Sequence, residues 1–264
     1  IQLENIDDRT RVGILNLWSE IYEDVKWYGN LDDTDRRNLI RVILKDLYNQ
    51  PIPTWIYVDE EMTLDKISNT IIYDSYNKVF DLLEYTVVIF HELKINSRYG
   101  YEYHKNTYYR KFNELFEREF VGYRFIDKKI SKISNSIEVE SINTVFVDSY
   151  NTVKEHISKA NILLGDRDNP DYQNSIKESL SALEALAQIV TGIDGAGATL
   201  GKMLKKLEDD GIIFGAMKSG FSALYGFASE GKGIRHSSVN GIEVGFEEAK
   251  YILVISTAFI NFVM

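Results

Sequence analysis

The chain has 264 residues, 44% of them hydrophobic and 27% charged, which is typical of a folded protein of about two domains and excludes a disordered chain. The formal net charge of −10 at pH 7 is unfavourable for a broad nucleic-acid surface, although a local basic site is compatible with it. The absence of cysteine excludes disulfides, thiolate zinc sites and cysteine nucleophiles, and it fits the reducing cytoplasm, where we expect the protein to act.

The first part of the chain has helical periodicity. The acidic pair Asp7-Asp8 suits the N-terminal end of a helix. The apolar residues that this helix is expected to bury are Val12, Ile14, Leu15, Trp18 and Ile21. Further helices are predicted at residues 32–48, at 64–91 as one long helix or two nearly collinear ones, and at 106–120.

Residues 121–133 change character, because apolar and polar residues alternate there around a short polar centre. This alternation predicts a small β-hairpin. The polar segment 134–136 follows, and it marks the predicted boundary between an N-terminal helical domain at residues 1–134 and a C-terminal helical domain at 135–264. The predicted fold class is therefore all-α, with two helical domains and a small β-hairpin between them.

The C-terminal half is predicted to be a bundle of about five helices joined by short turns. Its first helix is expected at residues 138–164. Asn169 is then suited to be the N-cap of the next helix, and Pro170 its first residue, over 171–191. The last three helices are expected at residues 199–209 with Thr199 as N-cap, at 214–229 and at 245–264. The apolar segment 251–264 is shorter than the roughly 20 residues that cross a bilayer, so we expect a buried helix and no membrane partner.

The densest polar feature is the glycine-rich connection at residues 229–241, which joins two apolar helices. Arg235 offers a fixed fork of donors for a phosphate or carboxylate, and His236 titrates near neutral pH. Together they could hold a phosphodiester and move a proton on it, which is the minimum for metal-free RNA cleavage by an attacking 2′-hydroxyl. The alternative, which composition alone favours, is that Arg235 pairs with a helix carboxylate and His236 caps the loop.

Glu184 is the predicted carboxylate partner of Arg235. It follows Leu183 at the border of an apolar stripe, and a partly buried carboxylate needs a cation nearby. The pair would either lock the bundle or hold Arg235 and His236 for catalysis. Lys202 and Lys206 lie on a basic face that is either a solvated surface or an RNA contact.

The remaining histidines, His91, His104 and His156, have no metal-ligand spacing to one another or to carboxylate pairs. We therefore interpret them as structural residues, and we expect neither a metal ion nor a cofactor.

Several segments of the C-terminal half form a set. They are residues 175–186, 198–202, 204–207, 225–226, 233–236 and 246–250. As a set they resemble the C-terminal HEPN-like domain of AbiJ-type abortive-infection proteins, over about residues 136–264. Residues 7–11 and 15–18 resemble one of the variable N-terminal domains attached to such C-termini in bacteria.

The resemblance implies a bacterial phage-defence factor. HEPN relatives are commonly metal-independent ribonucleases that act as dimers, with paired arginine–histidine loops at the interface. Their pattern has an arginine, a polar residue, and a histidine a few positions later. Arg235 and His236 match the first two positions, but residues 239–241 are Val, Asn and Gly, so His236 is a candidate base only on its own chemistry.

The leading hypothesis is a HEPN-type endoribonuclease in phage defence, dimerising through its C-terminal domain. In it, Arg235 holds the scissile phosphate, His236 exchanges the proton and Glu184 orients the arginine. The alternative is a non-catalytic helical module that senses a nucleotide, RNA or protein partner.

Overall fold

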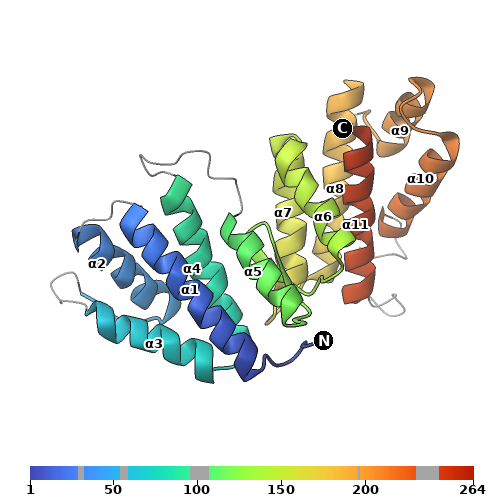
Figure 1. Cartoon of the computed structure of the whole chain (residues 1–264). Helices are drawn as coiled ribbons and strands as arrows, with labels where there is room; N and C mark the ends of the chain where they lie inside the picture. Colours follow the sequence, from blue (N-terminus) through green and yellow to red (C-terminus); the bar gives the residue numbers. More distant parts are fainter. Residues whose placement is uncertain (29–32, 54–58, 96–106, 196, 230–243) are drawn as a thin grey trace. The chain divides into compact units, whose positions relative to one another are not determined.

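The computed structural model describes residues 1–28, 33–53, 59–95, 107–195, 197–229 and 244–264 (Figure 1). Across these ranges the chain is α-helical except for one two-stranded antiparallel hairpin, which confirms the predicted fold class. Contacts divide the chain into two compact units, Ile1–Ser134 and Asn135–Met264.

The N-terminal unit is a helical assembly with the hairpin at its end. Its elements are α1 (Asp8–Tyr28), α2 (Asp33–Val42), the π-helical turn η1 (Ile43–Leu47), α3 (Glu60–Tyr73), α4 (Tyr76–Ile95), α5 (Thr107–Arg118), β1 (Arg124–Ile126) and β2 (Lys129–Ser131). The region predicted at 64–91 is two helices, because Asp74 takes an extended backbone (φ −79°, ψ 170°) that ends α3.

Helix α1 lies at the centre of this unit, since it packs against α3, α4 and α5. Trp18 is buried and stacks on Tyr22, with 5.4 Å between ring centroids. The indole N–H of Trp18 donates to the Thr86 hydroxyl on α4 at 2.8 Å. Val12 was expected in this core but is 50% exposed, whereas Ile14 and Ile21 are buried as predicted.

The predicted hairpin is confirmed, and side chains from two helices form hydrogen bonds to it. Its register pairs Arg124 with Ser131, Phe125 with Ile130 and Ile126 with Lys129. The amide of Asn113 on α5 bonds both the N–H and the carbonyl of Phe125, at 2.7 and 2.9 Å. The Glu84 carboxylate on α4 accepts the Ile130 N–H and the Lys129 ammonium, both at 2.8 Å.

The C-terminal unit is a helical bundle. Its helices are α6 (Ser136–Asp148), α7 (Asn151–Gly165), α8 (Tyr172–Thr191), α9 (Leu200–Asp209), α10 (Gly215–Ser229) and α11 (Phe246–Val263). The single helix predicted at 138–164 is wrong, because Ser149 (φ −88°, ψ 175°) and Tyr150 (φ −73°, ψ 149°) are extended and separate α6 from α7. None of the helices that the structure describes combines the length and apolarity of a bilayer span.

The predicted cap of α8 is also wrong. Asp171 is the N-cap, and its carboxylate accepts the Asn174 N–H at 3.0 Å. Asn169 instead donates its N–H to the Asp166 carboxylate at 2.9 Å, within the preceding turn. The predicted N-cap Thr199 is confirmed, since its hydroxyl accepts the Lys202 N–H at 3.3 Å.

Helix α8 is the main packing element of the C-terminal unit, since it contacts α7, α9, α10 and α11. Its side toward α7 carries the small buried residues Ser175, Ser179 and Ala182. Small residues allow two helices to approach closely, and the Ser175 hydroxyl donates to the Ala160 carbonyl of α7 at 2.9 Å.

We expect Thr86→Val to destabilise the N-terminal unit by about 1–3 kcal/mol, because the buried indole N–H of Trp18 would lose its acceptor without a change of side-chain volume. Urea unfolding followed by tryptophan fluorescence measures this, since all three tryptophans lie within residues 1–134.

Thr63→Val on α3 is the matched control in the same unit. Thr63 and Thr86 are both buried, and each donates its hydroxyl to the carbonyl four residues earlier, but Thr63 accepts no indole N–H. Equal unfolding midpoints for wild type and Thr86→Val would show that the indole bond contributes nothing to stability.

Candidate functional site

The predicted site at Arg235 and His236 lies outside the described residues. The structure describes the two helices that hold its ends, since α10 ends at Ser229 and α11 begins at Phe246. Rings from these helices pack directly, with 4.1 Å between the centroids of Phe221 and Phe259. The Gly245 N–H, just before α11, donates to the Glu248 carboxylate at 3.0 Å and fixes the start of that helix.

Glu184 lies on α8 and is half-buried, as predicted. It follows Ser175 by nine positions, which is about two and a half turns of helix, so it points away from the side of α8 that contacts α7. In the part of the chain that the structure describes, Glu184 forms no ion pair. Its pairing with Arg235 remains a prediction.

The predicted RNA-binding lysines lie on α9, and both are exposed. The Lys202 ammonium donates to the Gly197 carbonyl at 2.8 Å. Lys206 forms an ion pair with Asp210, and the neighbouring Lys205 pairs with Asp209 at 3.2 Å. The lysines of this face are thus held by local partners, and two of the three have their charge offset by an aspartate.

Two of the remaining histidines make internal contacts. The His91 ring is buried against Tyr109, with centroids 5.1 Å apart. His156 Nδ1 on α7 lies 2.6 Å from the Glu178 carboxylate on α8. Both support the interpretation of these histidines as structural, whereas His104 lies outside the described residues. Within the described ranges, no three potential ligand side chains gather where a metal ion could be held.

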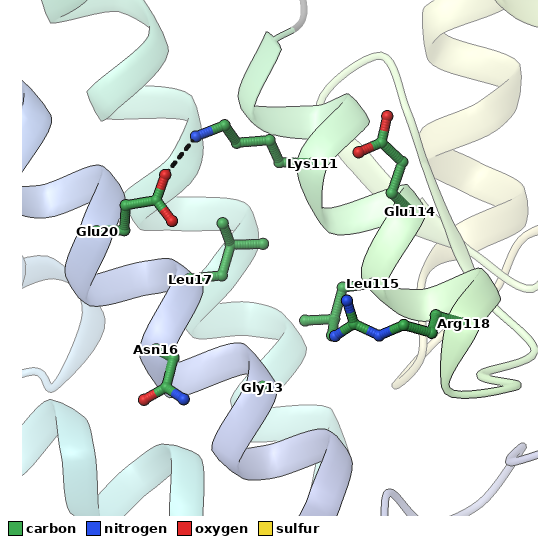
Figure 2. A pocket seen from close by; sticks show the side chains of 8 residues that line it. All are labelled: Gly13, Asn16, Leu17, Glu20, Lys111, Glu114, Leu115 and Arg118. Atoms are coloured by element: carbon green, nitrogen blue, oxygen red, sulfur yellow. Dashed lines mark hydrogen bonds and ion pairs between the residues drawn. The ribbon is translucent and has the colours of Figure 1, made fainter.

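A groove between α1 and α5 was missed by sequence reasoning (Figure 2). The two helices run antiparallel, because Glu20 contacts Lys111 at one end while Gly13 faces Leu115 further along. Gly13 and Leu115 approach closely, since a Cβ on Gly13 would lie 2.8 Å from a Leu115 methyl and that side chain would have to shift. The cavity measures about 390 Å³, within the range of small-molecule sites.

The groove has polar walls and an apolar floor. Its lining consists of Gly13, Asn16, Leu17 and Glu20 from α1 and Lys111, Glu114, Leu115 and Arg118 from α5. Two of the wall carboxylates are already paired, Glu20 with Lys111 at 2.6 Å and Glu114 with Arg110 at 2.5 Å. The lining residues recur every three or four positions on each helix. Residues of a buried helix face have the same spacing, so the sequence did not distinguish this groove from the core.

At the Arg118 end, α5 meets the start of α1 through one buried carboxylate. Glu119, whose side chain is 7% exposed, accepts the Arg118 Nε–H at 2.8 Å and contacts Arg9 Nε at 2.9 Å. Gln2 adds a backbone link, since its N–H donates to the Phe120 carbonyl at 2.8 Å. This arrangement holds two guanidinium groups on one anion.

Comparison with known proteins identifies the N-terminal half. Residues 1–148 match the family model of AbiJ N-terminal domain 4, which covers the whole N-terminal unit and α6. No curated protein and no solved structure matched the chain. Because the family match spans more than half of the chain, this protein belongs to the AbiJ family of abortive-infection, phage-defence proteins.

Proposed function

We propose that this abortive-infection protein acts as a metal-independent endoribonuclease of HEPN type through its C-terminal unit. The observation that carries the proposal is the adjacent pair Arg235 and His236 in a connection whose ends are anchored by α10 and α11. The resemblance of residues 136–264 to HEPN-like domains supports it. Functional residues concentrate on loops that rigid elements hold in place.

The chemistry requires only side chains that this chain has. Arg235 binds the scissile phosphate through its planar fork of donors and stabilises the charge that builds on the phosphoryl oxygens. His236 takes the proton of the ribose 2′-hydroxyl, and the 2′-oxygen forms a bond to phosphorus. The bond from phosphorus to the 5′-oxygen breaks, and that oxygen leaves with the proton that the imidazolium returns.

Glu184 is assigned the positioning of Arg235. A half-buried carboxylate that makes no ion pair with the described residues is costly, and a guanidinium is the partner that satisfies it best. The proposed assembly is a homodimer through the C-terminal units, which would bring two copies of the Arg235–His236 connection to one RNA.

The alternative function is a non-catalytic module that senses RNA, a nucleotide or a protein partner. One observation favours it, since residues 239–241 lack the histidine of the HEPN pattern. In that case Arg235 would bind a phosphate without any cleavage.

We expect purified wild-type protein to degrade RNA in the presence of a chelator. Arg235→Ala and His236→Ala should each lower the rate by about a hundredfold or more, because each removes a transition-state interaction. Gel analysis of a labelled RNA, with folding checked by circular dichroism, provides the measurement.

Arg110→Ala is the control for this assay, because Arg110 is an exposed arginine of the N-terminal unit that pairs only locally with Glu114. Equal rates in wild type, Arg235→Ala and His236→Ala would remove the ribonuclease assignment. If wild type binds the RNA but does not cleave it, the result would favour the sensing module.

Lys202 and Lys206 are proposed to contact the RNA backbone. In a His236→Ala background, which keeps the RNA intact, replacing both by Gln should weaken binding several-fold. The slope of log affinity against log salt should fall by about one per lysine that contacts a phosphate. Lys218→Gln is the control, since Lys218 lies on α10 and pairs with Glu208. An unchanged salt slope would show that Lys202 and Lys206 do not contact the RNA backbone.

A further inference from the structure

The N-terminal unit holds two arginines in a way that leaves most of their donors available. A guanidinium has five N–H donors, and Arg9 and Arg118 each direct only Nε toward Glu119. Their side chains are 77% and 65% exposed. Among the described residues, none accepts from the terminal amino groups of either arginine.

At this end of the groove, two guanidinium groups share the single Glu119 carboxylate. Further along the groove Lys111 cancels Glu20, and Arg110 cancels Glu114. The nearby Asp7 carboxylate accepts the Thr10 N–H, and this bond together with the positive charge of Arg9 lowers the pKa of Asp7.

The pair of arginines is also fixed in place. Glu119 is buried, so removing it from its cations would be costly. The N-terminal segment pairs with the chain beyond α5, since Gln2 bridges Val121 in parallel and Gly122 donates its N–H to the Gln2 carbonyl at 2.8 Å. Arg9 and Arg118 are therefore presented together without any rearrangement of the backbone, which lowers the cost of binding a ligand.

Figure 2 shows Arg118 at one end of the groove between α1 and α5. Arg9 lies on the same face of α1 as Gly13, one turn before it, and so extends the groove beyond Gly13. The half-buried Leu17 supplies accessible apolar surface in the groove, and Asn16 adds a side chain that both donates and accepts hydrogen bonds. The site thus combines an anion-binding end, an apolar surface and one amide.

We propose that this groove binds a nucleoside monophosphate. The phosphate lies on the terminal amino groups of Arg9 and Arg118, the planar base covers the half-buried Leu17, and Asn16 forms hydrogen bonds to a polar edge of the base. Paired guanidinium groups match phosphate oxygens in geometry and charge. This site lies in the N-terminal unit and does not depend on the proposed ribonuclease activity.

Titration calorimetry of the purified full-length chain with AMP tests the proposal, with adenosine as the ligand that lacks the phosphate. We expect wild type to bind AMP at least about tenfold more tightly than adenosine, because the charge-assisted bonds to phosphate are lost in adenosine. Arg9→Gln and Arg118→Gln should each weaken AMP binding by about tenfold or more.

Each variant keeps one guanidinium on Glu119, so both should remain folded, and thermal unfolding checks this. Arg37→Gln is the matched control, because Arg37 is an exposed arginine on α2 in the same unit. It should bind AMP like wild type.

Three results would overturn the proposal. They are the absence of any AMP binding at millimolar concentration, equal affinities of wild type for AMP and adenosine, and wild-type affinity for AMP in both Arg9→Gln and Arg118→Gln. The second result rests on wild type alone, so it holds even if a variant fails to fold.

Discussion

The rotation of α8 about its own axis is the constraint on which the proposed RNA site depends. Two contacts with α7 fix this rotation, the Ser175 hydroxyl on the Ala160 carbonyl and the His156 imidazole on the Glu178 carboxylate. With this side of α8 held against α7, helical geometry directs Glu184 to the other side. A helix with the same sequence but a different rotation would turn Glu184 toward α7.

The N-terminal unit depends on a comparable buried carboxylate. Glu119 joins the first turn of α1 to the end of α5, and the bridge between Gln2 and Val121 secures the same junction through the backbone. Buried carboxylates are stable only with cations beside them. We propose that Glu184 positions Arg235 in the same way as Glu119 positions Arg9 and Arg118.

Helical periodicity predicted most of the helices, and the alternation of apolar and polar residues predicted the hairpin, because burial of one face repeats along the sequence. The break at Ser149-Tyr150 was missed, since neither glycine nor proline marks it. Asn169 and Pro170 resembled a helix start, but Asp171 makes the capping bond.

The groove was not predictable, because the contact of Glu119 with Arg9 joins residues 110 positions apart. The site at Arg235 and His236 was predicted from residue chemistry and family resemblance. Both residues lie outside the described residues.

The most direct test of the central claim is the chemistry of the RNA ends that the purified protein produces in the presence of a chelator. Attack by the 2′-hydroxyl, with a guanidinium and an imidazole as the only catalysts, leaves a 2′,3′-cyclic phosphate on one fragment and a 5′-hydroxyl on the other. Mass spectrometry of the fragments should find these two ends. Fragments with 3′-hydroxyl and 5′-phosphate ends, or intact RNA, would contradict the account.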